Sequence, residues 1–231
     1  MSMKEGNNTN SVAPQARIMA AAQTLGLAIS DTQAHQLNSY QEQLLKWNKV
    51  YNLTALRDPE KVLVQHIFDS LSVIAPLDDL FDQGKQISVL DVGSGGGLPG
   101  AVMAIMRPDW QVCCIDAVEK KTAFIMQAAS VLGLPNLVSE HIRIERKAPA
   151  NADLVISRAF ASLVDFSDWS GKHVSQQGHL VAMKGRLASE EVSQLEQKGE
   201  WTVSRVHKLN VPELDAERCL VWLQQVGKYD K

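Results

Sequence analysis

The sequence predicts one doubly wound α/β core of the Rossmann-like type, with a mostly parallel seven-stranded sheet and a helical extension before it. Three observations support this fold class. Short apolar runs alternate with helical patterns from Ile87 onward, a glycine-rich loop follows the first run, and the last two runs have no helical pattern between them. Strands that alternate with helices form right-handed crossovers and therefore a parallel sheet. A chain of 231 residues is long enough to bury such a core.

The N-terminal part predicts a tail followed by helices. Residues 1–15 are polar and rich in Asn and Ser, so we expect a disordered tail there. Residues 16–82 form the predicted helical extension. Ser30 or Asp31 can cap a first helix with apolar periodicity, and a second helix begins near Pro59, because proline suits a first helical turn.

Residues 83–231 form the predicted α/β core. A helix follows the glycine loop and ends near Pro108, and Gly133 ends a helix that begins at Lys120. The polar stretch Ser189–Lys198 predicts one more helix. We expect the last two strands to pair antiparallel at one edge of the sheet. The predicted strands are Ile87–Val92, Gln111–Asp116, Leu137–Ile142, Asp153–Ser157, Gly178–Met183, Trp201–Leu209 and Cys219–Val226.

Composition and charge exclude several classes of protein. A net charge of −3 excludes a globally basic nucleic-acid-binding protein, although it does not exclude a local basic patch. The 3 cysteines, two of which are adjacent, do not suit a secreted disulfide scaffold. The 6 histidines lack the spacing of zinc ligands, so no metal is expected. The N-terminus lacks the apolar segment of a signal peptide and no run is long enough to span a bilayer, which favours a cytoplasmic protein.

The glycine-rich loop is the most specific single feature. From Val89 the chain reads VLDVGSGGGLPG, in which a strand ends, the backbone turns and a helix begins. Glycines let the main chain approach a ligand and expose N–H groups at a helix N-terminus. Gly95, Gly97 and Gly100 match the G-x-G-x-x-G spacing. Dinucleotide enzymes share this spacing, and a purely structural turn also produces it, so the spacing alone does not identify a ligand.

Two acids favour S-adenosylmethionine over a dinucleotide. Asp91 directly precedes the loop, where a carboxylate disfavours a diphosphate but can orient the loop or approach a cationic amino-acid group. Asp116 ends the next strand, where it can accept hydrogen bonds from both ribose hydroxyls. S-adenosylmethionine carries a ribose and a positive charge but no phosphate. Two alternatives stay open for Asp116, because an acid there also suits NAD or simply caps the helix that begins at Lys120.

Motifs that the chain lacks reduce the number of atoms that could accept the methyl group. The fourth strand ends in ISRAF rather than the Asn/Asp-Pro-Pro-aromatic stretch usual in exocyclic amine methyltransferases. Cys113, Cys114 and Cys219 lie in predicted strands, so we interpret them as packing residues rather than as nucleophiles for a pyrimidine carbon. Guanine N7 has a free lone pair and no proton to remove, so its methylation needs alignment and no general base. The sequence permits this acceptor without proving it.

Longer stretches resemble one known family. They are KWNK with YNLT (46–54), HIFDSL (66–71), the glycine loop (91–100), ISRAFASL (156–163), Lys184-Gly185 and residues 212–218. They are similar to the bacterial small-subunit ribosomal RNA guanine-N7 methyltransferases, also called glucose-inhibited division protein B. The resemblance covers most of the chain. It implies methyl transfer from S-adenosylmethionine to N7 of a guanine in the decoding-region loop of 16S rRNA, by a cytoplasmic monomer with neither DNA nor a membrane as partner.

The resemblance also implies site residues. Together with Asp116 and the loop residues Ser94, Gly95 and Gly97, it places at the cofactor Gly93, Leu98, Ile144, Glu145 and Arg158. The family's basic active-site positions, which the resemblance assigns to RNA phosphate or the target base, are Arg143, Lys184 and Arg218, with Lys120 nearby. One departure is that Arg146 follows Glu145, where many relatives have a second acid.

Alternatives stay open at this point. A small-molecule methyltransferase on the same fold agrees with the negative net charge, and a non-catalytic ribosome-assembly module would keep the fold without turnover. We interpret Trp47 and Tyr51 as core anchors rather than as base-stacking residues. His66, Asp69 and Ser70 share one helical face, but hydrogen bonds between the helical extension and the sheet explain them equally well. We therefore leave these three residues out of the catalytic set.

Overall fold

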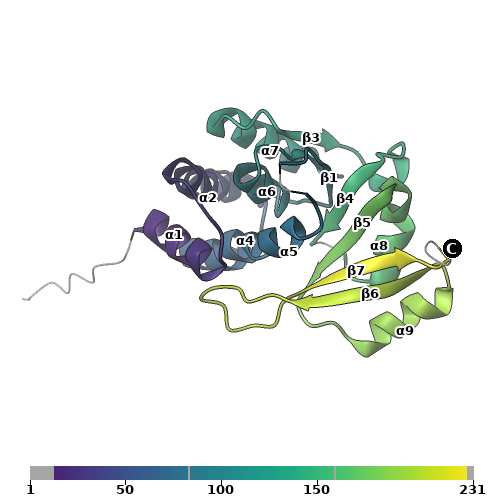
Figure 1. Cartoon of the computed structure of the whole chain (residues 1–231). Helices are drawn as coiled ribbons and strands as arrows, with labels where there is room; N and C mark the ends of the chain where they lie inside the picture. Colours follow the sequence, from purple (N-terminus) through teal and green to yellow (C-terminus); the bar gives the residue numbers. More distant parts are fainter. Residues whose placement is uncertain (1–12, 83, 159, 228–231) are drawn as a thin grey trace, which may run out of the picture.

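A computed structural model of the chain describes residues 13–82, 84–158 and 160–227. Within these ranges seven strands form one sheet in the order β3-β2-β1-β4-β5-β7-β6, with helices on both faces (Figure 1). The predicted Rossmann-like fold is confirmed. The strands are β1 (Ser88–Val92), β2 (Gln111–Asp116), β3 (Leu137–His141), β4 (Ala152–Ser157), β5 (Val174–Lys184), β6 (Trp201–Lys208) and β7 (Cys219–Gln225).

The strand pairing places a crevice above the centre of the sheet. Strand β1 pairs in parallel with β2 on one side and with β4 on the other. Strand β7 lies antiparallel between β5 and β6, so the predicted antiparallel edge is confirmed. Because the crossovers leave β1 in opposite directions, they diverge above the carboxyl ends of β1 and β4, where open α/β sheets bind ligands.

One face of the sheet is covered by the N-terminal helices and by the helices of the first two crossovers. Their buried side chains form a continuous core with the sheet that extends from Ile18 to Trp222. Within the described ranges, no helix has the length and apolar character needed to cross a bilayer. The elements on this face are α1 (Pro14–Thr24), α2 (Asp31–Tyr51), α3 (Pro59–Val62), the π-helical turn η1 (Leu63–Phe68), α4 (Asp69–Leu71), α5 (Ile74–Asp78), α6 (Gly100–Met106) and α7 (Glu119–Leu132).

Helix α1 corrects the predicted tail. Pro14 and Gln15 form its first turn, so the expectation of disorder is wrong for these two residues. Proline favours the first helical position, and the helix is retained because Ile18 is fully buried against the core. The predicted tail residues 1–12 lie outside the described residues.

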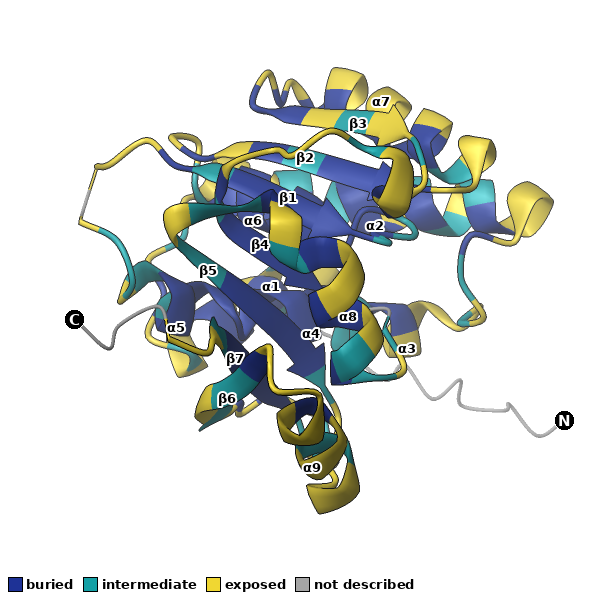
Figure 2. Ribbon diagram, turned by 90° about the vertical axis from the view of Figure 1, so that its right-hand side faces the viewer, coloured by how far each residue is buried: buried dark blue, intermediate teal, exposed yellow. Residues whose placement is uncertain are grey.

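The other face is covered by α8 (Leu163–Ser170) and α9 (Ser189–Lys198), with the short turns η2 (Ile144–Arg146) and η3 (Gly171–His173) beside them. Phe166 and Leu195 bury these helices against the sheet, whereas the outer side of α9 is exposed (Figure 2). Helix α8 was not predicted. It is short, and Ser162 caps it by accepting a hydrogen bond from the Asp165 backbone N–H at 3.0 Å.

Side-chain amides fix α2 across two other helices. Ser30 caps α2 in a capping box with Gln33. The Gln33 side-chain amide also donates to the Ile105 carbonyl at 3.0 Å, at the end of α6. Gln36 donates in the same way to the Leu132 carbonyl at 2.9 Å, at the end of α7. These bonds satisfy otherwise unpaired terminal carbonyls and place α2 over the loop between β1 and α6.

Candidate active site

The glycine loop between β1 and α6 turns through left-handed backbone conformations. The φ angles of Gly93, Gly95 and Gly97 are 65°, 60° and 83°, a region that favours glycine. A Cβ atom on Gly97 would lie 2.9 Å from Ile125 Cγ1 of α7, whereas one on Gly95 would meet nothing within 4 Å. The loop therefore packs Gly97 against the protein and presents Gly95 to open space. Leu98 is buried as well.

Helix α2 holds this loop from the core side. The buried Tyr40 hydroxyl donates a hydrogen bond to the Gly96 carbonyl. Its ring lies 5.9 Å from that of Phe124 in α7. Sequence reasoning did not identify Tyr40 as a loop contact, because its partner is 56 residues away.

Asp91 anchors the start of α6 from a fully buried position. Its Oδ2 accepts a hydrogen bond from the Gly100 backbone N–H at 2.9 Å, and its Oδ1 has no partner among the described residues. Burial raises the pKa of Asp91 from 3.8 to about 7, although the bond from Gly100 and the charge of Arg158 oppose the rise. The unpaired oxygen can accept one further hydrogen bond, but Asp91 is fully buried and lines neither cavity described below. Its predicted approach to a cationic amino-acid group therefore stays a prediction.

Asp116 joins the loop to the start of α7. Its Oδ2 accepts from the Gly95 backbone N–H at 3.0 Å and its Oδ1 from the Val118 backbone N–H at 2.9 Å. Lys121 lies 3.6 Å away. The alternative that Asp116 caps this helix is wrong, because Val118 is the N-cap residue of α7 and no described side chain caps the helix; Asp116 instead ties the glycine loop to the turn before α7. Each oxygen keeps a further lone pair for a ribose hydroxyl, and the predicted role in cofactor binding stays a prediction.

A cleft of about 150 Å³ opens beside Asp116. It brings together Gly93, Arg143, Ile144 and Glu145, which the resemblance assigned to the site. The turn that carries Ile144 is held by the buried His173, whose Nε2 donates to the Ile144 carbonyl at 3.3 Å.

The cleft also has an aromatic wall that sequence reasoning missed. Phe160 and Trp169 line it with ring centroids 5.7 Å apart in an edge arrangement. Flat apolar surfaces of this kind suit an adenine ring. The signal was weak because Trp169 comes from α8, which was not predicted. With Asp116, this wall gives the cleft groups that fit the ribose and the adenine of S-adenosylmethionine.

A larger cavity of about 520 Å³ is lined by Arg158, directly after β4, whereas Phe160, two residues further on, lines the cleft. Arg158 and Arg218 line it and meet at the buried carboxylate of Asp69. Arg158 Nη1 donates to Asp69 Oδ2 at 3.2 Å, and Arg218 Nε donates to Asp69 Oδ1 at 3.1 Å. The tertiary structure thus places Asp69, which the sequence analysis left out, at the centre of the basic cluster.

Of the other predicted basic residues, Lys184 also lines the large cavity, whereas Arg143 lines the cleft. The Lys184 ammonium donates to the Phe160 and Ala161 carbonyls, both at 3.1 Å, and pairs with Glu191 at 2.5 Å. Lys184 therefore holds the segment after β4. Arg143 is exposed on the cleft, and its side chain makes no hydrogen bond to the residues that the structure describes.

His66 lines the large cavity as a neutral group. Burial and the neighbouring charge of Arg158 lower the pKa of His66 from 6.5 to about 4. Its Nδ1 lies 3.0 Å from the Gln65 carbonyl, which can only accept, so Nδ1 carries the proton. Its Nε2 then accepts from the Thr54 hydroxyl at 2.8 Å. Both ring nitrogens are engaged.

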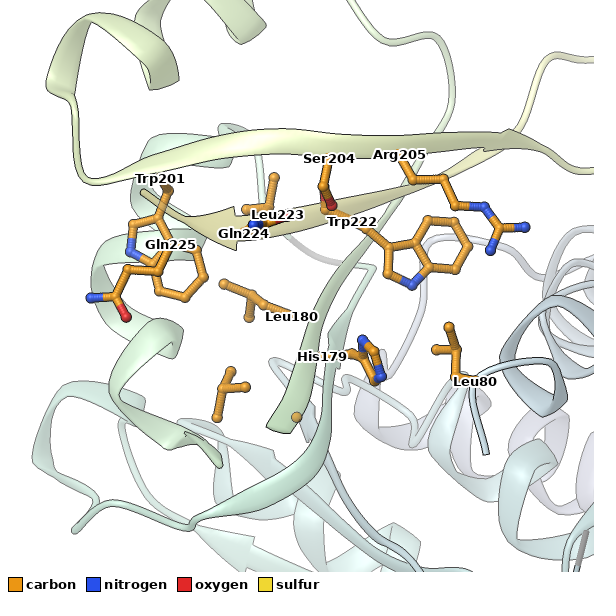
Figure 3. Close-up of a pocket in the computed structure, with 12 residues that line it drawn as sticks. Leu80, His179, Leu180, Trp201, Ser204, Arg205, Trp222, Leu223, Gln224 and Gln225 are labelled. Atoms are coloured by element: carbon orange, nitrogen blue, oxygen red, sulfur yellow. The ribbon is translucent and has the colours of Figure 1, made fainter. Parts of the chain in front are cut away.

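A third cavity, of about 290 Å³, lies at the opposite end of β5. Figure 3 shows Arg205, Trp222 and His179 around it. The Arg205 guanidinium carbon lies 4.8 Å from the centroid of the Trp222 ring, a cation–π contact. This cavity is lined by the first half of β5, whereas Lys184 at the other end of β5 lines the large cavity. Because it lies away from the carboxyl ends of the parallel strands, where such sheets bind ligands, we do not assign it to the reaction.

Comparison with known proteins identifies the family. Residues 33–221 match the family model described as rRNA small subunit methyltransferase G. The chain belongs to this family. A small subunit methyltransferase G from Bordetella avium is 54% identical, and the alignment covers 93% of this chain and 95% of that protein. One from Leptothrix cholodnii is 46% identical, with 90% and 94% covered. Membership confirms the predicted methyltransferase class and S-adenosylmethionine as the cofactor.

Solved structures agree on the fold of this small subunit methyltransferase G family member. A SAM-dependent methyltransferase from Aquifex aeolicus has a TM-score of 0.56 at 18% identity, covering 74% of this chain and 96% of that chain. A ribosomal protein L11 methylase from Lactobacillus delbrueckii has a TM-score of 0.51 at 13% identity, with 73% and 79% covered. At these identities the similarity supports the architecture alone.

Proposed function

We propose that this methyltransferase transfers the methyl group of S-adenosylmethionine to N7 of a guanine in the decoding-region loop of 16S rRNA. One observation carries the choice of atom: the large cavity offers no free general base among its described lining residues. Asp69 is held by two arginines, and both nitrogens of His66 are engaged. An acceptor that must lose a proton needs such a base, whereas guanine N7 does not.

The residues divide between the two partners of the reaction. Asp116, the wall of Phe160 and Trp169, and Asp91 would hold the ribose, the adenine and the amino-acid group. The bound cofactor supplies an electrophilic methyl group on its sulfonium. Arg218 would orient the acceptor through guanine O6 or a neighbouring phosphate, and Arg158 beside it would face the cofactor, so that catalysis rests on alignment.

A thiolate mechanism has little support from the cysteines. Burial raises the pKa of Cys113 to about 12, and burial also raises the pKa of Cys114 and Cys219. These thiols stay protonated near neutral pH, and a protonated thiol is a poor nucleophile. Methylation of a pyrimidine carbon through a cysteine adduct is therefore disfavoured.

The partner in this proposal is 16S rRNA in the small subunit, bound by a monomer in the cytoplasm. The net charge of −3 means that RNA affinity depends on local basic groups. Arg143, Arg158, Arg218 and the exposed Lys120 supply them at the carboxyl ends of the strands. Affinity for RNA should therefore fall as salt rises. The molar mass of the purified protein, measured by light scattering, tests whether it is a monomer.

The deciding experiment incubates the protein with labelled S-adenosylmethionine and small subunits that lack the modification, followed by nucleoside analysis. We expect label in 7-methylguanosine, and label on another base would overturn the acceptor. RNA binding without transfer would favour the non-catalytic module, and transfer in RNA-depleted extract would favour a small-molecule substrate. Arg218→Gln should lower activity strongly but leave it measurable. Arg205→Gln, beside the distant third cavity, should keep it and serves as the matched control.

A further inference from the structure

We infer that Asp69 is a positioning residue that holds Arg158 and Arg218 side by side over the acceptor cavity and thereby couples cofactor binding to acceptor binding. The inference rests on the proposed function. In this role Asp69 touches neither the cofactor nor the acceptor. It acts through the two guanidiniums that do.

Each arginine donates a hydrogen bond to a different oxygen of the Asp69 carboxylate. Oδ2 accepts from Arg158 and Oδ1 from Arg218, at 3.2 and 3.1 Å, while the Asp69 side chain is only 4% exposed. The arginines come from 89 and 149 residues away along the chain, at the end of β4 and the start of β7. The described contacts join them to each other only through this carboxylate. Without its charge, two like charges would face each other in a partly buried cavity and move apart.

The two arginines lie toward different partners of the reaction. Arg158 follows β4 directly, and Ile156 of β4 pairs with Asp91 of β1 just before the glycine loop, which places Arg158 at the loop end of the sheet and toward the cofactor. Arg218 belongs to the segment before β7, and its Nη1 donates to the Glu217 carbonyl at 2.8 Å. A shift of one guanidinium away from Asp69 leaves more of the carboxylate charge to the other, so the position of each arginine depends on its neighbour. Asp69 therefore links the cofactor side of the cavity to its outer side.

The charges around Asp69 also favour an anionic partner. One carboxylate faces two guanidiniums, His66 is neutral, and Lys184 is paired with Glu191. One positive charge is left uncompensated at the cavity. Arginine N–H groups that Asp69 does not use are strong donors to phosphate oxygens and to carbonyl oxygens. Asp69 thus orients the free donors without cancelling their charge.

The test compares Asp69→Asn, which removes the charge and keeps the shape, with Asp153→Asn. Asp153 is a matched control, because its carboxylate accepts from the Ser88 N–H and hydroxyl, at 2.8 and 2.9 Å, at the opposite end of the same strands. The measurements are kcat and KM for small subunits, the cofactor Kd and the melting temperature. We expect kcat/KM to fall roughly tenfold or more for Asp69→Asn and less than about twofold for Asp153→Asn, although both variants lose some thermal stability.

A double-mutant cycle separates positioning from stability. In an Arg218→Gln background, the further change Asp69→Asn should lower kcat/KM by less than about threefold, because one of its two partners is already gone and only Arg158 is left for Asp69 to hold. Equal losses in both backgrounds, or full activity of Asp69→Asn, would overturn the inference. If Asp69→Asn does not fold, Asp69→Glu takes its place in the same cycle, with the same criterion. If the wild-type protein transferred no methyl group to small subunits, the proposed function itself would be overturned. The failure of the inference and the failure of the proposed function therefore give different results.

Discussion

Gly100 illustrates, at the scale of single residues, how closely α6 packs on the sheet. A Cβ atom there would lie 2.4 Å from Cys114 Sγ and 2.9 Å from Asp91 Oδ2. We expect Gly100→Ala to lower the free energy of unfolding by about 2–3 kcal/mol through overpacking. Gly133→Ala is the control, because its φ of +65° imposes strain but a Cβ meets nothing within 4 Å; it should lose about 1 kcal/mol. Urea unfolding measures both, and equal losses would contradict close packing as the cause.

Asp116 offers a direct test of cofactor binding. Asp116→Asn keeps the shape of the side chain and removes the charge that would accept ribose hydroxyls, so the Kd for S-adenosylmethionine should rise roughly tenfold. Titration calorimetry measures it. Asp109→Asn, an exposed acid just before the opposite end of β2, should bind normally. Unchanged affinity in Asp116→Asn would leave this residue with its structural role alone.

His66 predicts a pH dependence of stability. Its pKa is lowered from 6.5 to about 4 in the folded protein, so folding favours the neutral ring. The stabilisation is fully present above pH 6.5 and is lost as the pH falls toward 4, in total about 3 kcal/mol.

A His66→Asn variant isolates this contribution. Asp91 has a raised pKa of about 7, which favours the folded state as the pH falls, but it is common to both proteins. Denaturant unfolding at several pH values should therefore show a smaller loss of stability below pH 6.5 in the variant than in the wild type. Parallel pH profiles would show that the His66 ring does not titrate as inferred.

At the scale of elements, Gln33 tests how α2 is fixed over the glycine loop. Gln33→Glu keeps an acceptor for the Ser30 N–H but cannot donate to the Ile105 and Met106 carbonyls at the end of α6. It also puts a negative charge at a helix C-terminus. We expect a loss of about 1–3 kcal/mol in the free energy of unfolding.

The same change on an exposed helix position is its control. Gln23→Glu on α1 adds the same negative charge, but it removes no buried hydrogen bond, because Gln23 is exposed. It should change stability by less than about 0.5 kcal/mol. Urea denaturation of both variants compares them, and similar losses would show that the charge rather than the lost donor matters.

At the scale of the whole molecule, the helical extension and the sheet share one hydrophobic core. Buried residues from Ile18 of α1 to Trp222 of β7 are continuous. Arg17 of α1 also pairs with Glu213 at 2.6 Å, in the segment that leads to Arg218. We expect residues 16–82 to unfold together with residues 83–231. Scanning calorimetry should show a single transition with equal calorimetric and van't Hoff enthalpies, and a separate early transition would contradict this.

The sequence by itself determined the sheet and the position of the glycine loop. Apolar runs bounded by glycines and polar turns report local conformation, so six strands are within a residue or two of their predicted ends, and the antiparallel edge is as expected. The exception is β5, which begins at Val174 rather than at Gly178, because its outer half is too polar to read as a strand. Helix α8 was missed for a related reason, since a short amphipathic stretch has little periodicity to detect.

Only the tertiary structure decided which charged groups meet. Asp69, Arg158 and Arg218 carry no local signal of one another, because a hydrogen bond between residues 89 or 149 positions apart depends on how the helices pack on the sheet. The same holds for Tyr40 at the glycine loop and for Trp169 at the cleft. Local sequence fixes backbone preferences over a few residues, whereas a site is assembled from side chains that burial of a common core brings within bonding distance.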